Sequence, residues 1–269
     1  MADRTSIDRL AQVWGSTAEL CRGFTAEQWA LPTDCPGWSV KDNVSHLIGT
    51  ESMLLGRPSP SPAPPGLAHV RSPIGEINEA WVSARRPQPG PEVLAEFEDV
   101  TAKRLAGLRA MTDDQLEAET PSPIGKVPYS TFMDVRVMDC WVHEQDIRRA
   151  TARRGGLDSD AAEAAMRRLT STFGYVVGKR AGAPDGSSVV LDLTGPLGRT
   201  TAVALSGGRA AAVDAPTEPT VRLTMSGETF VCLATGRREG AEALDTGEVS
   251  MRGDADLGRR VVTNLATMP

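Results

Sequence analysis

Residues 131–150 constrain the fold of this chain most, because they predict one long amphipathic helix whose apolar side carries ionisable groups. At about 100° per residue, Asp139 and His143 fall on the same face as the apolar residues of this helix, one above the other. Burying a carboxylate and an imidazole is costly unless a partner compensates them. A divalent metal ion compensates both, so this helix is a candidate wall of a metal site.

Composition is typical of a soluble globular protein. The 269 residues are 40% hydrophobic and 24% charged, with a net charge of −6. Acidic and basic residues are mixed, so we expect neither a nucleic-acid partner nor a membrane partner. No apolar run approaches the roughly 18 residues of a membrane span, and the N-terminus lacks a signal-peptide pattern. We therefore expect a cytoplasmic protein with reduced cysteines, as a monomer or weak homodimer.

The first half of the chain predicts a four-helix bundle. Helical spacing of apolar residues extends over 4–22, 40–56, 91–111 and 131–150, with a shorter helix at 76–84. Ser39 can cap the second of these helices, with Asp42 in the capping-box position. Residues 57–75 are too rich in proline for a helix and predict a long loop or lid, and a second proline-rich connection precedes residue 131.

Composition changes near residue 152, and the second half predicts an α+β domain. After a helix at 160–177, alternating apolar residues predict strands within 187–195, 200–213 and 220–227. A helix follows Ser226 over 227–238, and residues 248–268 predict a strand, a turn and a closing helix. The expected architecture is a two-domain α+β protein, with a bundle over 1–155 and a mostly antiparallel sheet with helices over 156–269.

His46 is the third candidate metal ligand. It lies away from the centre of the apolar stripe of its own helix, so it can face the space between helices of a bundle. Two imidazoles and one carboxylate suit zinc, iron(II), nickel or manganese, and three protein ligands leave positions open, as in catalytic sites. Asp146 is the candidate that orients an imidazole N–H from outside the ligand set.

These residues also have plainer interpretations. Asp139 can pair with Arg136 or another arginine, and His143 can be a buried, hydrogen-bonded histidine. Cys35 can be a nucleophile, but no base lies near it in sequence, which favours a small turn residue. His69 lies in the proline-rich stretch, where exposure to solvent is expected.

Arg237 and Arg238 lie near the end of the helix predicted at 227–238. Cations there stabilise the helix dipole. In the functional alternative, one of them binds the carboxylate of an anionic substrate.

Two stretches together resemble the mycothiol-dependent maleylpyruvate isomerase family: PTDCPGWSVKDNVSHLIG at 32–49 and VMDCWVHEQDIRRA at 137–150. The N-terminal half is similar to the DinB-like metal-binding four-helix bundle. The stretches TVRLTMSGETFVCLATGRR and VSMRGDADLGRRVV resemble the C-terminal domain of that family, which is similar to sterol carrier protein domains.

The resemblance implies a divalent metal, usually zinc, held by two histidines and an acid. His46 matches the first ligand, and Asp139 and His143 match the acid-x3-His pair, with Asp139 standing where the family often has Glu. It also implies mycothiol as a thiol co-substrate that attacks an electrophilic small molecule, by isomerisation or S-transfer. We assign the expected substrate-binding arginine to Arg237. Alternatives are a non-catalytic small-molecule or lipid binding module and a metal-dependent hydrolase.

Overall fold

The chain forms two compact units in the computed structural model, which describes residues 3–60 and 62–267. The units are Met1–Ala165 and Met166–Pro269, and the division falls inside helix α8 (Asp160–Ser171). The first unit is helical and the second contains a five-stranded sheet with helices. The expected two-domain α+β architecture is therefore confirmed. Among the described residues, none of the helices has both the length and the apolar character that crossing a membrane requires.

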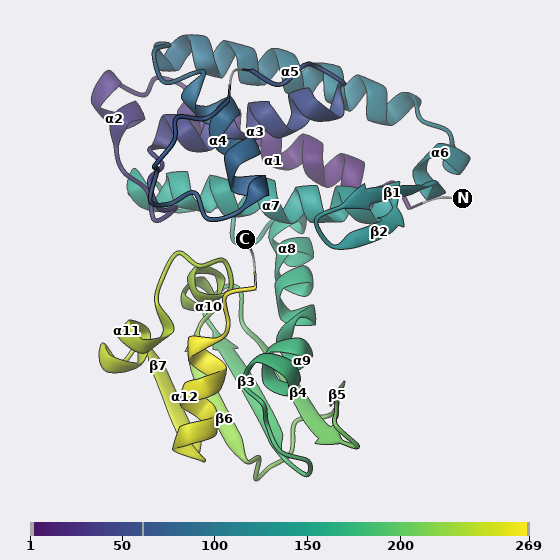
Figure 1. Ribbon diagram of the computed structural model, residues 1–269, viewed down its shortest axis with the longest axis vertical. Coiled ribbons are helices and arrows are strands. Elements are labelled where there is room, and N and C mark those ends of the chain that lie inside the picture. The colour runs from purple at the N-terminus through teal and green to yellow at the C-terminus, as the bar shows by residue number, and fades with distance from the viewer. Residues whose placement is uncertain (1–2, 61, 268–269) are drawn as a thin grey trace. The chain divides into compact units, whose positions relative to one another are not determined.

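Four long helices form the bundle of the first unit (Figure 1), as predicted: α1 (Thr5–Cys21), α3 (Val40–Leu54), α5 (Gly90–Ala110) and α7 (Tyr129–Ala150). Helix α3 packs against α5 and α7, and α1 packs against the same two helices. Their facing sides bury a continuous core that includes Leu10, Leu47, Phe97, Met133 and Trp141. This packing places α3 and α7, which carry the candidate ligands, side by side.

Local capping sets the start of α3. The Ser39 side chain accepts a hydrogen bond from the Asp42 backbone, and the Asp42 carboxylate accepts one in return from the Ser39 backbone, so the predicted capping box is confirmed. Just before it, residues 33–38 make a tight turn closed by a hydrogen bond from Thr33 N to Trp38 O. The turn fixes where α3 begins, and with it the position of His46.

The connections of the bundle hold short elements that spacing did not all predict: α2 (Ala26–Ala30), α4 (Pro73–Ser83), α6 (Asp113–Glu117), β1 (Glu119–Ser122) and β2 (Gly125–Pro128). Helix α4 begins at Pro73, inside the stretch expected to be loop, because Ser72 caps it and proline suits the first helical position. The hairpin β1–β2 was predicted as an irregular connection. A two-stranded ribbon has only edge strands, which tolerate proline, so its prolines did not prevent pairing.

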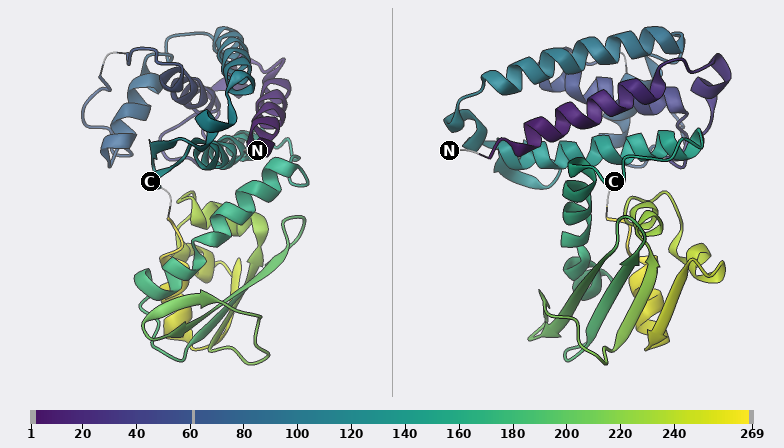
Figure 2. Two further views of the ribbon diagram at one scale, coloured as in Figure 1. Left: turned by 90° about the vertical axis from the view of Figure 1, so that its right-hand side faces the viewer. Right: turned by 180° about the vertical axis from the view of Figure 1, so that it is seen from behind.

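A single sheet organises the second unit: β3 (Ser188–Thr194), β4 (Arg199–Ser206), β5 (Arg209–Ala212), β6 (Val221–Ser226) and β7 (Val249–Gly253). The strand order is β5-β4-β3-β6-β7. Only the β3–β6 pair in this sheet is parallel, so the predicted mostly antiparallel sheet is confirmed. Helices α9 (Phe173–Tyr175) and α12 (Ala255–Thr263) lie on the same face of it (Figure 2).

The helix predicted at 160–177 is interrupted. Helix α8 ends at Ser171, and after α9 a π-helical turn follows at Val176–Arg180. The hydroxyls of Thr170, Ser171 and Thr172 all donate to backbone carbonyls three or four residues earlier, and such bonds bend helices. The remaining helices are α10 (Gly227–Ala234), which follows Ser226 as predicted, and α11 (Gly240–Asp245).

Candidate functional site

The three predicted metal ligands come together between α3 and α7. His46 Nε2 lies 3.3 Å from Asp139 Oδ2, and His143 Nε2 lies 3.8 Å from Asp139 Oδ1. One ligand atom from each of the three residues lies within 4.8 Å of the others. Both imidazoles are almost fully buried, while 28% of the Asp139 side chain is exposed, so the site opens to solvent on the side of the carboxylate.

The spacing of these atoms fits a divalent metal. Ligand bonds of about 2.0–2.1 Å in tetrahedral geometry separate neighbouring ligand atoms by about 3.3 Å. The observed separations, 3.3 Å to Asp139 Oδ2 and 3.8 Å to Asp139 Oδ1, are close to this value, and one ligand atom from each of the three residues lies within 4.8 Å of the others. Two neutral imidazoles and a carboxylate are also a donor set that zinc accepts. The residues present thus fit the implied metal, with coordination positions left for other ligands.

The outer nitrogen of His143 is held by two groups. His143 Nδ1 lies 2.6 Å from Asn43 Oδ1 and 3.4 Å from Asp146 Oδ2. A donated Nδ1–H leaves the Nε2 lone pair directed at the candidate metal position. Asp146 is the residue that the sequence nominated for this contact, but Asn43 is closer and was missed. Its position three residues before His46, on the same helix face, is the signal that could have identified it.

A second cluster of potential ligands shares His143. Cys35, His143 and Asp146 also place one ligand atom each within 4.8 Å of one another. Folding therefore brings a base, His143, close to Cys35, although none lies near it in sequence. In this second cluster, however, Asn43 engages His143 Nδ1, and Arg149 Nη2 donates to Asp146 Oδ1 at 2.6 Å. Asn43 thus engages the His143 nitrogen that faces Asp146, whereas the His46, Asp139 and His143 set uses the other nitrogen, Nε2, and therefore fits a metal better.

Both predicted environments of Asp139 exist at once, since the carboxylate faces the imidazoles and also pairs with Arg136. Arg136 Nη1 donates to Asp139 Oδ2 at 2.7 Å, and its Nε donates to the buried Glu51 at 2.9 Å. Glu51 also accepts from Arg104 at 2.9 Å. Burial raises the pKa of Asp139, but Arg136 and then His46 outweigh it and hold this pKa well below its ordinary value. The carboxylate is therefore ionised and suited to bind a cation.

His46 is held in its neutral form. Burial lowers its pKa from the ordinary 6.5 to about 4, although Asp139 opposes that shift. Among the described residues, its Nδ1 has no hydrogen-bond partner. A neutral imidazole has a lone pair to offer, which is the form that binds metals.

Trp38 forms part of the wall of this site. Its ring centroid lies 5.0 Å from that of His46 and 5.7 Å from that of His143, both tilted. These separations are typical of aromatic contacts that stabilise ring orientation. The two imidazoles lie 4.6 Å apart, so the three rings pack as one group.

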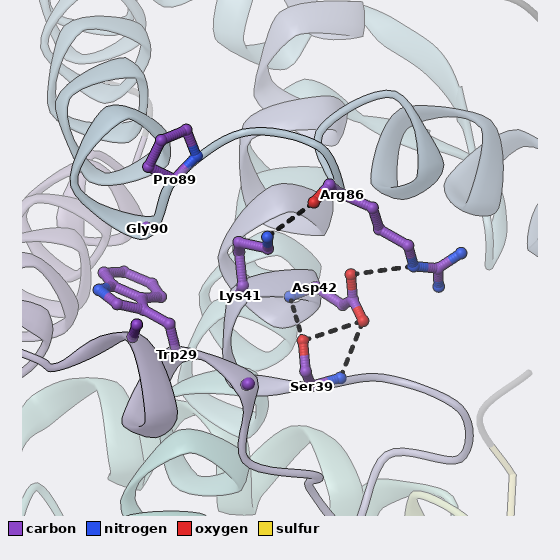
Figure 3. A pocket seen from close by; sticks show the side chains of 9 residues that line it. Trp29, Ser39, Lys41, Asp42, Arg86, Pro89 and Gly90 are labelled. Carbon is purple, nitrogen blue, oxygen red and sulfur yellow. Dashed lines mark hydrogen bonds and ion pairs between the residues drawn. The ribbon is translucent and has the colours of Figure 1, made fainter.

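A cavity of about 380 Å³ lies beside the start of α3 (Figure 3). Lys41 donates to the carbonyl oxygens of Arg86 and Gln88 at 2.8 and 2.9 Å, and Arg86 Nε lies 3.3 Å from Asp42 Oδ1. The charged groups in its wall are therefore engaged with the chain itself. These contacts anchor the first turn of α3 to the connection that follows α4.

Arg237, the candidate substrate-binding residue, lies in the second unit just after α10. Its Nη1 donates to the carbonyl oxygen of Thr235 at 2.7 Å, and the neighbouring Arg238 pairs with Glu248. Contacts with a helix-terminal carbonyl agree with the dipole interpretation of this position. A role of Arg237 in substrate binding stays a prediction.

Comparison with known proteins matches both parts of the chain. Residues 10–148 match the family model of the mycothiol maleylpyruvate isomerase N-terminal domain, and residues 154–266 match that of the SCP-2 sterol transfer family. Uncharacterized proteins from two strains of Mycobacterium tuberculosis are 26% identical over 238 residues, covering 85% of this chain and 82% of theirs.

Solved structures support the same assignment at the level of the fold. Crystal structures of the mycothiol-dependent maleylpyruvate isomerase and of a point mutant of it are 16% and 17% identical to this chain. Each aligns with a TM-score of 0.55 over 93% of both chains. The chain therefore belongs to the mycothiol-dependent maleylpyruvate isomerase family, with a second domain of the SCP-2 type.

Proposed function

We propose that this protein is a metal-dependent enzyme that uses a low-molecular-weight thiol, mycothiol, to attack an electrophilic small molecule. The observation that carries the proposal is the convergence of His46, Asp139 and His143, with the Nδ1 of His143 held by Asn43. Family membership supports the choice of thiol. The ligand set favours zinc.

The roles of the residues follow from their contacts. His46, Asp139 and His143 hold the cation. Asn43 and Asp146 keep the His143 ring oriented, and Arg136 keeps Asp139 ionised. A bound divalent metal lowers the pKa of a thiol and so supplies a thiolate at neutral pH. Trp38 packs against both imidazoles, which are buried.

Two reactions suit an activated thiol. In isomerisation, the thiolate adds to one carbon of a conjugated double bond, rotation follows about the resulting single bond, and loss of the thiolate restores the double bond. In S-transfer, the thiolate forms a carbon–sulfur bond that persists in the product, and a leaving group or a proton completes the balance. Arg237 is the proposed partner of a substrate carboxylate.

Metal content is the first test. Elemental mass spectrometry of protein purified without chelators should find about one zinc per chain, lost in Asp139→Ala with His143→Ala. A thiol assay then separates the chemistries, because turnover of a maleylpyruvate-type electrophile should require added mycothiol. Full metal content in His46→Gln together with unchanged thiol-dependent turnover would contradict the proposal, and turnover without any thiol would favour a hydrolase.

A second candidate function concerns the second unit. Its match to the SCP-2 sterol transfer family favours binding of an apolar ligand, with the bundle as a scaffold. Native mass spectrometry of freshly purified protein separates the two candidates. A bound lipid without any metal would favour the binding module, whereas bound zinc without lipid would favour the enzyme.

A further inference from the structure

Glu79 is a fully buried carboxylate on α4 whose two oxygens contact different partners. Its Oε2 accepts a hydrogen bond from Trp38 Nε1 at 3.0 Å and lies 2.9 Å from His69 Nε2. Its Oε1 accepts from Ser83 at 2.8 Å and pairs with Arg86 at 2.5 Å. One oxygen therefore joins two segments that come from elsewhere in the chain, and the other anchors the carboxylate to its own surroundings.

The charge of Glu79 strengthens these contacts. Burial raises the pKa of this carboxyl, but the hydrogen bonds from His69, Trp38 and Ser83 outweigh it, and the pKa lies below its ordinary value. Hydrogen bonds to an ionised acceptor are shorter and stronger than neutral ones. The shared oxygen thus holds both the indole and the imidazole firmly.

The first of these partners, Trp38, belongs to the wall of the candidate metal site. Its ring packs on both His46 and His143. Rotation of the indole breaks its bond to Glu79 or its contact with these rings. The orientation of two metal ligands is therefore linked, through one ring, to a carboxylate that does not touch the metal position itself.

The second partner, His69, attaches the proline-rich segment (residues 57–60 and 62–72) to the same oxygen of Glu79. Its ring fills the space above Gly37, where a Cβ would lie 2.3 Å from His69 Nδ1. The expectation that His69 is exposed was therefore wrong, because its side chain is only 18% exposed. Between the segment and α4 lies a cavity of about 640 Å³, so close packing secures the segment only in part. The His69–Glu79 contact supplies the specific attachment.

We infer that Glu79 is a positioning residue of the metal site. It holds Trp38 against the two histidine ligands, and through His69 it links the position of Trp38 to the docking of the proline-rich segment. The inference rests on the proposed function, since it presumes that these histidines bind a metal. It makes His69, 23 residues after His46 in the sequence, a determinant of metal affinity.

Cobalt(II) and zinc titrations of the full chain test this, because the visible absorption of cobalt(II) reports the geometry of its ligands. Partners outside a ligand set typically change metal affinity about 10–100-fold. We expect Glu79→Gln to weaken zinc binding about tenfold and to alter the cobalt spectrum. His69→Ala should change both in the same direction, and His69→Gln, whose amide can donate to Glu79, should restore them.

Ser83→Ala is the matched control, because it removes a bond to the other oxygen of Glu79 and leaves in place Trp38, His69 and the Arg86 ion pair that also keeps the carboxylate ionised. It should keep the wild-type affinity and spectrum. If folded His69→Ala and Glu79→Gln both match wild type, the inference is overturned while the metal site stands. If wild-type protein binds neither metal, the proposed function fails, and the inference fails with it.

Discussion

At the scale of single residues, burial decides the protonation of His46. His46 has a pKa of about 4 in the folded protein and 6.5 ordinarily, so the fold favours its neutral form. The contribution of His46 to the free energy of unfolding is fully present above pH 6.5. It is lost as the pH falls towards 4, because the unfolded chain takes up the proton first. At one pKa unit per about 1.4 kcal/mol, the loss is about 3 kcal/mol.

Urea unfolding of metal-free protein at several pH values tests this expectation. The free energy of unfolding should fall more steeply between pH 6.5 and 4 for wild type than for His46→Gln, whose side chain does not titrate there. Equal slopes for the two proteins would mean that His46 accepts its proton without penalty in the folded state.

Glu51 is the residue on which the charge balance of the site depends. It is fully buried, with one oxygen bonded to Arg104 and the other to Arg136. Removing one partner of a buried ion pair costs about 3–5 kcal/mol, because it leaves uncompensated charge. We expect Glu51→Gln to lose stability of this order in thermal or urea unfolding. Glu98→Gln, at a solvent-exposed pair with Arg22, should leave stability nearly unchanged, because exposed ion pairs contribute little.

At the scale of elements, the contact between α3 and α4 depends on a glycine. A Cβ at Gly49 would lie 2.5 Å from Trp81 Cβ, so Gly49→Ala must push the helices apart. Overpacking of this kind costs about 1–3 kcal/mol. Gly15→Ala is the matched control, because nothing lies within 4 Å of a Cβ there and the position is inside α1. Alanine favours helix, so the control should gain up to about 1 kcal/mol. A stable Gly49→Ala protein would show that α4 adjusts freely.

The elements also show which parts of the structure local sequence can predict. Apolar spacing and the capping box at Ser39 were enough for α3, and the Asp139/His143 pair was predicted because both lie on one helix. Asn43 and Glu79 were missed as parts of the site, since their contacts join residues far apart in sequence. The hairpin β1–β2 was missed because its prolines obscured the strand pattern. Contacts between residues far apart in sequence can therefore be identified only from the fold, whereas helices and their faces can be predicted from local sequence.

At the scale of the whole molecule, the chain contains two units, each with its own buried core. A ligand that binds only the folded state stabilises it by about 2.7 kcal/mol at a hundredfold excess over Kd. Because the proposed ligands all lie in the first unit, zinc should stabilise that unit and leave the second unchanged. Multidomain proteins commonly unfold in separate steps, which makes the difference observable.

Hydrogen exchange of the full chain, followed by mass spectrometry with and without zinc, tests this. Slowly exchanging amides in α3 and α7 should exchange up to about 100-fold more slowly with zinc, while those of the β3–β6 pair keep their rates. Asp139→Ala should abolish the slowing in both helices. Equal slowing in the sheet would show that the two units unfold as one cooperative structure, and unchanged rates throughout would show that zinc does not bind the folded bundle.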